Sequence, residues 1–235
     1  ALEAQTDGLS PVPSVRTIAR VLERRGALDA SRRTRRPAPP PGWHLPDVRV
    51  RRAELDSFDV IEGMRFLGGT PLDVLTGLSL HGALPGAWPM TGVTSAGAVR
   101  ALIEHWRANG LPGYAQFDND TRFIGGWAWP NSIGAVIRLC LAVEVVPVFV
   151  PPREMGFQAA VEALNGRWQR AVWARRPAMA DLATLQLRSD AYVAAWRHRH
   201  AVRIESAPAR QPFPADPPDL TRPPEGRLVF LRRTS

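Results

Sequence analysis

The sequence predicts an α/β protein in which a mixed β-sheet is flanked by helices. Segments with strand and helix periodicity alternate from about residue 48 onwards, and Pro-rich stretches lie on both sides of this region. Apolar residues make up 45% of the 235 residues, which is enough for a substantial core. We therefore expect one domain of ordinary size with an appendage at each end.

The predicted elements follow one another in a recognisable order. The helix over Ser95–Asn109 is the clearest, because Val99, Leu102, Ile103 and Trp106 share one of its faces and an Asn-Gly pair ends it. The predicted strands are 55–61, 72–80, a segment around Trp88, 114–118 and 145–150, and the other predicted helices are 133–143, 157–174 and 182–200. Three strands, then helix, strand, helix, strand and helix, is the order of a ribonuclease-H-like fold.

The flanking segments predict a role in binding. Ser14 is a suitable cap for a helix over residues 13–26 that ends at Gly26, and we interpret residues 1–28 as the end of a helix-turn-helix domain, with a plain surface helix as the alternative. The remaining divisions are a basic Pro-rich linker at 29–47, the core at 48–176, a helical extension at 177–206, and a Pro-rich linker with the start of a small β domain at 207–235. The incomplete look of both ends suggests a fragment of a longer protein.

Composition and charge favour a polyanionic partner. All 30 basic residues are Arg, and the formal net charge is +8. Clustered positive charge gains affinity for nucleic acid by releasing counterions from phosphates. Cys140 is the only cysteine, so neither an internal disulfide nor a zinc cluster is expected. The apolar run at 133–150 is interrupted by Arg138, Glu144 and Pro147, so we expect a soluble intracellular protein.

Three carboxylates are candidates for a metal site. Strand alternation places Asp56 on one face with Phe58 and Asp59 on the other, so only one of these two can face a given site. Asp118 follows a strand at a turn, where sites collect in α/β sheets. Glu162 shares a polar helical stripe with Gln158, Asn165 and Gln169. Each of these acids taken alone is more typical of a solvated surface, and their order and context make them candidates.

These contexts resemble insertion-sequence transposases whose catalytic core is shared with retroviral integrases. The resemblance extends from Pro13 to about Pro214. It rests on Glu54-Leu-Asp56, on Gln116-Phe-Asp-Asn-Asp-Thr-Arg-Phe123, which resembles an Asp-Asn-Gly-x-x-Phe signature, and on Pro151-Pro-Arg followed by Gly156-Phe-Gln-Ala-Ala-Val-Glu-Ala-Leu-Asn165. Asp120 stands where the family usually has Gly. Glu162 follows Asp118 by 44 residues, a long separation that the Trp-rich segment 125–130 accounts for.

The resemblance implies a function, a site and partners. Asp56, Asp118 and Glu162 would be the catalytic triad and would hold two Mg²⁺ or Mn²⁺ ions. The chain would cleave transposon ends and transfer the strand into target DNA, as a homo-oligomer on double-stranded DNA in a bacterial cytoplasm, associated with the nucleoid. The residues expected to contact DNA phosphates are Arg16, Arg20, Arg32, Arg33, Arg35, Arg36, Arg153 and Arg167.

Two other functions stay open at this point. A catalytically silent, transposase-derived protein would bind DNA without metal and without cutting it. Another ribonuclease-H-like nuclease, such as a resolvase or ribonuclease, would hydrolyse its substrate without joining strands.

Overall fold

The computed structural model describes residues 13–27, 42–125, 133–151, 155–174, 181–216, 218–221, 226 and 229–230. The chain divides into two compact units, Ala1–Pro39 and Pro40–Ser235. In the first unit the described element is α1 (Val15–Arg24), whose cap residue Ser14 accepts a hydrogen bond from the backbone N–H of Thr17 at 3.2 Å. The helix and its cap are confirmed, and its membership in a helix-turn-helix domain stays a prediction.

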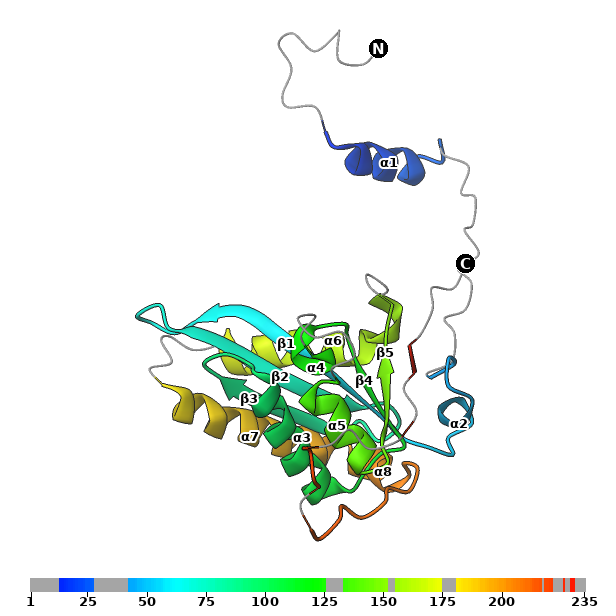
Figure 1. The fold of residues 1–235 in the computed structure, drawn as a ribbon. Coiled ribbons are helices and arrows are strands. Elements are labelled where there is room, and N and C mark those ends of the chain that lie inside the picture. Colours follow the sequence, from blue (N-terminus) through cyan, green and yellow to red (C-terminus); the bar gives the residue numbers. More distant parts are fainter. Residues whose placement is uncertain are drawn as a thin grey trace. The chain divides into compact units, whose positions relative to one another are not determined.

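The second unit is built on one mixed sheet (Figure 1). Its strands are β1 (Leu55–Arg65), β2 (Pro71–Ser79), β3 (Pro85–Met90), β4 (Tyr114–Phe117), β5 (Val146–Phe149) and β6 (Val229–Phe230), in the spatial order β3-β2-β1-β4-β5-β6. β1, β2 and β3 pair antiparallel, whereas β4, β5 and β6 continue from β1 as parallel neighbours. β1 therefore lies at the centre, between the antiparallel and the parallel halves.

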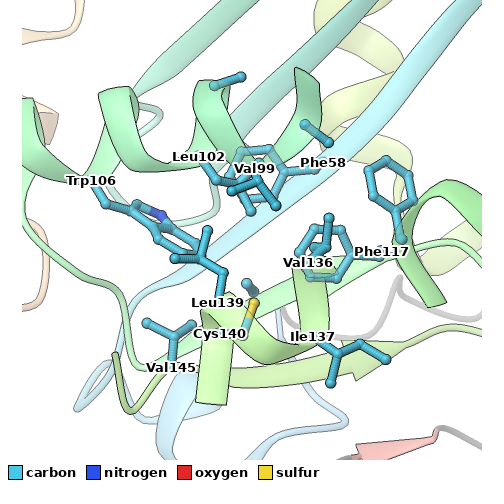
Figure 2. Packing of buried hydrophobic residues seen from close by; sticks show 14 of the residues in the cluster. Phe58, Val99, Leu102, Trp106, Phe117, Val136, Ile137, Leu139, Cys140 and Val145 are labelled. Atoms are coloured by element: carbon cyan, nitrogen blue, oxygen red, sulfur yellow. The ribbon is translucent and has the colours of Figure 1, made fainter. Parts of the chain in front are cut away.

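The main core lies on one face of the sheet, under α3 (Ser95–Asn109), α4 (Thr121–Ile124) and α5 (Ala135–Ala142). Figure 2 shows Phe58 of β1 and Phe117 of β4 among Leu102, Trp106 and Leu139 from the helices. The rings of Phe58 and Phe117 stack with centroids 5.6 Å apart. Phe58 also needs Gly77 on the neighbouring strand, since a Cβ on that glycine would lie 2.7 Å from the ring. This packing fixes which side chains of β1 point toward α3.

The opposite face is covered by α6 (Ala159–Trp168), the π-helical turn η3 (Gln169–Trp173) and α7 (Leu182–Arg199). Trp168 is fully buried there, together with Ile61 of β1 and Leu185 of α7. α7 runs along the edge strand β3, and its Trp196 donates a hydrogen bond to the Ala83 carbonyl at 2.9 Å. Ile61 and Asp59 are two residues apart on β1, so they share this face.

Shorter elements close the end of the sheet where β1 begins. α2 (Pro46–Arg49) contributes Val48 to a small cluster with Leu55 and Val148. α8 (Ala201–Glu205) follows α7, and Arg203 donates hydrogen bonds to the carbonyls of Leu80 and His81, each at 2.6 Å. The short turn η2 (Met155–Phe157) precedes α6.

The C-terminal segment differs from the prediction of a linker leading to a separate β domain. Gln211 forms an antiparallel bridge with Leu111, and Phe213 and Leu220 pack against the main core. β6 adds to the same sheet by pairing with β5 through Val148 and Val229. The reason is that this Pro-rich stretch carries apolar residues, which pack against the core. Likewise, Leu45, predicted to lie in the N-terminal linker, is buried in the second unit.

The predicted architecture is otherwise confirmed. The observed bounds of the central strands and helices agree with the predicted ones to within a few residues, and α3 has the predicted bounds. β1 continues to Arg65, four residues beyond its predicted end. In the part of the chain that the structure describes, no helix is long and apolar enough to cross a membrane.

Candidate active site

Asp59 lies near the middle of β1, on the face covered by α6. Its Oδ2 accepts a hydrogen bond from Asn165 Nδ2 at 2.7 Å, and its Oδ1 accepts one from the Val60 N–H at 2.9 Å. Thr76 of β2 donates to Asn165 Oδ1 at 2.6 Å, which fixes the amide so that its N–H₂ points at Asp59. The carboxylate is thus held in a defined position on the central strand.

Asp118 follows the last residue of β4, the strand parallel to β1. Its Oδ1 accepts a hydrogen bond from the Asp120 N–H at 3.2 Å, and its side chain is half-buried. Burial raises the pKa of Asp118 to about 6, and the negative charges of Asp120 and Asp59 add to this shift. Asp59 and Asp118 are therefore close enough for their charges to interact.

Glu162 lies in the first turn of α6, with an exposed side chain. Burial raises the pKa of Asp59, and the charge of Glu162 raises it further. Two amides hold the start of α6 on the sheet: Gln116 of β4 donates to the Phe157 carbonyl at 2.8 Å, and Gln158 donates to the Phe58 carbonyl at 3.2 Å. These contacts bring Glu162 to the side of the sheet where Asp59 lies.

A second group of charges borders these three acids. Arg122 of α4 forms ion pairs with Asp120 and with Glu62 of β1, the latter at 2.7 Å. Asp120 also caps α4 by accepting from the Arg122 N–H at 2.7 Å. Arg122 therefore offsets the charge of two neighbouring carboxylates. Among the described residues, no basic side chain lies within ion-pair distance of Asp59, Asp118 or Glu162.

The structure corrects the prediction for Asp56. Its buried carboxylate accepts hydrogen bonds from Arg210 at 2.9 and 2.5 Å and from Trp106 Nε1 at 3.1 Å. Both oxygens are engaged on the face covered by α3, opposite α6. Alternation correctly separates Asp56 from Asp59, and Asp56 lies on the face away from α6; the identity of the metal ligands stays a prediction. Asp59 is the residue that lies with Asp118 and Glu162.

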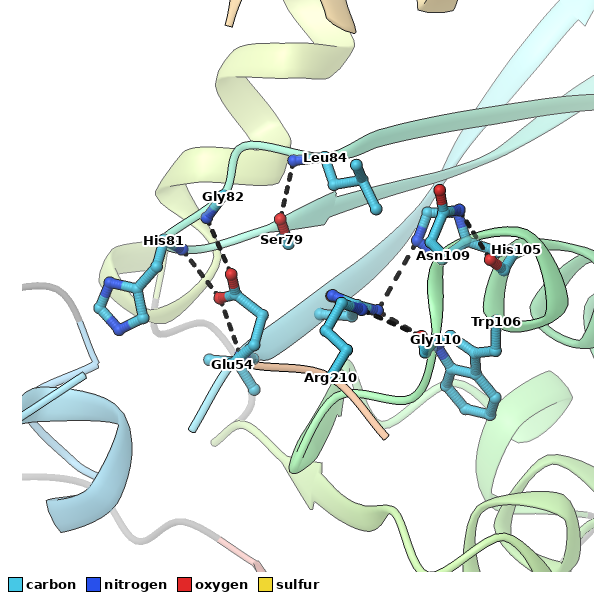
Figure 3. A network of polar contacts seen from close by, with 12 residues as sticks. Glu54, Ser79, His81, Gly82, Leu84, His105, Trp106, Asn109, Gly110 and Arg210 are labelled. Carbon is cyan, nitrogen blue, oxygen red and sulfur yellow. Dashed lines mark hydrogen bonds and ion pairs between the residues drawn. The ribbon is translucent and has the colours of Figure 1, made fainter. Parts of the chain in front are cut away.

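The surroundings of Asp56 form a buried polar network at the start of β1. Figure 3 shows Arg210 beside Trp106 and Gly110, and Arg210 Nε donates to the Gly110 carbonyl at 3.0 Å. Glu54 accepts hydrogen bonds from the N–H groups of His81 and Gly82, both at 2.8 Å. The network joins β1, the β2–β3 turn, the end of α3 and the C-terminal segment, which is a structural role.

Three of the eight arginines predicted to contact DNA lie among the described residues. Arg16 and Arg20 are exposed on α1. Arg167 is exposed on α6, with its guanidinium 5.4 Å from the centre of the Trp196 ring. The other five, Arg32, Arg33, Arg35, Arg36 and Arg153, lie outside the described residues. The Trp-rich segment also lies outside them from residue 126 onwards.

Sequence reasoning missed the amides that support the acids. The sequence places Gln158 and Asn165 on the stripe of Glu162 but predicts no role for them. Their signal was the helical spacing, which puts both beside Glu162. Thr76 and Gln116 carried no recognisable signal, because each acts through strand pairing that only the folded sheet creates.

The three acids form a donor set suited to a hard divalent cation. Carboxylate oxygens are the ligands that Mg²⁺ and Mn²⁺ prefer, and mutual repulsion of this kind is relieved when a cation binds. Among the described residues, no three acidic, His or Cys side chains lie close enough in this structure to hold a metal ion. Binding would therefore need these three side chains to move closer together.

The raised pKa of Asp118 predicts how pH changes the stability of the metal-free protein. A carboxyl group whose folded pKa of about 6 exceeds its usual 3.8 stabilises the folded state only when protonated. That contribution is full below about pH 4 and is lost as the pH rises through about 6. In EDTA, we expect the melting temperature of wild type relative to Asp118→Asn to rise as the pH falls from 7 to 5. A pH-independent difference between the two would contradict this assignment.

Comparison with known proteins places the fold. No protein-family model matches the sequence, and no curated protein matches it at a significant level. Among solved structures, a chain of the simian T-cell lymphotropic virus intasome, determined with PP2A regulatory subunit B56 gamma, matches with a TM-score of 0.50 and 15% identity. The match covers 70% of this chain and 58% of that chain. This chain has a ribonuclease-H-like fold.

Two isolated catalytic cores match over a smaller part of the chain. The HTLV-2 integrase catalytic core domain, solved with magnesium in a trimeric form, has a TM-score of 0.44 at 12% identity and covers 61% of this chain and 82% of its own. The BIV integrase catalytic core domain has a TM-score of 0.42 at 14% identity, with coverages of 57% and 79%. At such TM-scores and identities, these two matches carry no conclusion about the chemistry of this chain.

Proposed function

We propose that this chain is a DNA transposase that cleaves transposon ends and joins the freed 3′ hydroxyl to target DNA. The observation that carries the proposal is the approach of Asp59, Asp118 and Glu162, from β1, the end of β4 and α6, on one side of the sheet. The ribonuclease-H-like fold and the strongly basic composition support a nucleic-acid substrate.

Each acid has a distinct part in the proposal. Asp59 and Asp118 would hold the Mg²⁺ ions, because Asp59 lies on β1, Asp118 directly follows the adjacent parallel strand β4, and their charges interact. Glu162 would contribute a further carboxylate from α6. Bound ions of this kind stabilise the attacking and leaving oxygens of an in-line displacement at phosphorus. Asn165 orients Asp59 from α6 and is a positioning residue.

The proposed reaction requires two DNA ends to be held together. We therefore propose that the protein works as a homo-oligomer on double-stranded DNA. Arg16 and Arg20 on α1 are exposed and available for phosphate contacts. The linker arginines Arg32, Arg33, Arg35 and Arg36 stay predicted contacts, since they lie outside the described residues.

Strand transfer by the full chain tests this function. The substrate is a pool of duplexes with randomised terminal sequences and free 3′ hydroxyls, incubated with a supercoiled plasmid and Mn²⁺. Joined products are then sequenced. We expect joining by wild type and by Glu104→Gln, which removes an exposed carboxylate from α3, and none by Glu162→Gln.

The competing functions give different products. Plasmid or duplex hydrolysis that needs Mn²⁺ and Glu162, without joining, would replace the transposase with another nuclease of this fold. DNA binding that is unchanged in EDTA, with neither cleavage nor joining under any of these conditions, would indicate a catalytically silent DNA-binding protein.

A further inference from the structure

The surface formed by α6, η3 and α7 is unusually rich in arginine, and we call it the α6–α7 surface. Between residues 163 and 200 the sequence contains seven arginines and two acidic residues, Asp181 and Asp190. Asp181 caps α7, and Asp190 accepts a hydrogen bond from Gln186 on the same helix at 2.8 Å. Five of these arginines belong to described helices: Arg167, Arg170, Arg188, Arg197 and Arg199.

The two helices pack so that several of these cations meet. Trp168 of α6 donates a hydrogen bond to Ser189 of α7 at 3.3 Å. Arg167 lies over the Trp196 ring, which also packs against Tyr192 with centroids 6.0 Å apart. Tyr192, Trp196 and the ring of His200, stacked 4.6 Å from Trp196, follow one another at intervals of four residues. The result is an aromatic stripe along α7 bordered by guanidinium groups.

Three arginines of this surface lie near the side chain of Tyr192. Burial raises the pKa of Tyr192, and the positive charges of Arg167, Arg199 and Arg170 oppose that shift. Three cations from α6, η3 and α7 therefore act on one phenol. Within the described part of the chain, none of them has a carboxylate within ion-pair distance.

Three polar groups on α7 also lack partners in the described structure. The hydroxyl of Tyr192, Nη1 of Arg188 and Nε of Arg197 are buried without a hydrogen bond. Tyr192 and Arg188 are four residues apart, so they lie on the same side of the helix. Buried polar groups of this kind are normally satisfied, and uncompensated like charges repel one another. A bound anion would accept hydrogen bonds from these polar groups and would reduce the repulsion between the arginines.

We propose that the α6–α7 surface binds the phosphate backbone of duplex DNA. Guanidinium groups bind phosphate oxygens in pairs, and a row of them fits a regularly spaced polyanion. Arg167 and Arg170 follow Glu162 by five and eight residues on a continuous helical segment, which corresponds to roughly 7 to 12 Å along the axis at 1.5 Å per residue. This span equals about two to four phosphates of one strand.

This inference rests on the proposed function in one respect only, the identity of the DNA that the surface would hold. DNA bound on this surface would extend toward the three carboxylates, so the surface would hold the duplex close to the reacting phosphate. Binding itself needs neither metal nor catalysis. It can therefore be measured separately from strand transfer.

The test is binding of the full chain to a fluorescent 30-bp duplex in EDTA over a range of salt concentrations. The test variant is Arg167→Gln/Arg170→Gln/Arg199→Gln. The control is Arg49→Gln/Arg100→Gln/Arg107→Gln, which removes the same charge from exposed positions on α2 and α3. Arg107 is a matched residue, since it lies over the Phe213 ring at 5.4 Å as Arg167 lies over Trp196.

We expect the test variant to bind at least about 10-fold more weakly at 0.1 M salt, and its salt slope to fall by about 2 to 3, because each lost phosphate contact removes about 0.9. The control should change affinity less than about threefold, and the corresponding Arg→Lys triple variant should keep the wild-type slope. Equal losses in test and control variants, or an unchanged slope in the test variant, would overturn the inference and leave an acidic protein segment as the better ligand. Thermal denaturation of each variant checks that it is folded.

The two proposals fail in different ways. Suppose wild type does not join strands, but the salt dependence of DNA binding is still weaker in the test variant than in wild type. The proposal of transposase activity is then wrong, and the proposal of a DNA-binding surface is supported. If wild type joins strands and the test variant binds DNA as wild type does, only the α6–α7 surface is wrong.

Discussion

Asp59→Asn is expected to abolish strand transfer while leaving the protein folded. The substitution keeps the size of the side chain and a carbonyl oxygen that can accept from Asn165, but it removes the charge needed to hold a divalent cation. Loss of residues that only support a metal ligand lowers activity by about 10- to 100-fold, so loss of a ligand should exceed about 100-fold. The measurement is the initial rate of joining with Mn²⁺.

The stability of the same variant separates a metal ligand from a packing residue. Asp59 is repelled by Glu162 and Glu62, so removing its charge should not lower the melting temperature of the metal-free protein. Mn²⁺ should raise the melting temperature of wild type, because a ligand that binds the folded state stabilises it, and should not raise that of Asp59→Asn. Wild-type joining by Asp59→Asn would refute its assignment to the metal site.

Asp56→Asn is expected to have the opposite effect, with a large loss of stability. Arg210 is largely buried, with 12% of its side chain exposed, and it forms its ion pair with the buried Asp56, so the substitution leaves a mostly buried cation without its partner. Breaking one side of such a pair costs about 3 to 5 kcal/mol. At about 2 to 4 °C per kcal/mol for a protein of this size, the melting temperature should fall by about 6 to 20 °C.

A double-mutant cycle tests whether the pair itself is responsible. Arg210→Gln alone should also destabilise the protein, because it leaves Asp56 buried beside the uncharged variant side chain. Asp56→Asn/Arg210→Gln should be less destabilised than the sum of the single variants, since neither charge is then left unpaired. Additive losses would show that the two side chains stabilise the protein independently. At a temperature where Asp56→Asn is folded, it should retain metal-dependent stabilisation.

The pair also explains why the C-terminal segment belongs to the core unit. Arg210 crosses from that segment to β1 and to the end of α3, and Gln211 continues the contact by pairing with Leu111. Detachment of the segment would expose Asp56 and the apolar residues beneath Phe213. Loss of stability in Asp56→Asn should therefore include loosening of residues 207–214, which hydrogen exchange would detect.

Much of the fold is determined by local sequence patterns. Helical spacing in Ser95–Asn109 and the cap at Ser14 predict their helices, because each depends on residues within a few positions of one another. Strand alternation likewise separates Asp56 from Asp59 on opposite faces of β1. Glu162 and Asn165 are placed on one stripe by the same local geometry. These features need no knowledge of the rest of the chain.

Only the tertiary structure decided which face of β1 carries the candidate site. Alternation is symmetric, so it cannot tell which face α6 will cover. The choice depends on Arg210, 154 residues after Asp56, which neutralises that acid inside the core. It also depends on Phe58, whose ring fills the space left by Gly77 and turns toward α3. Asp59 is left facing Asn165 because long-range packing, and no local signal, sets the orientation of the central strand.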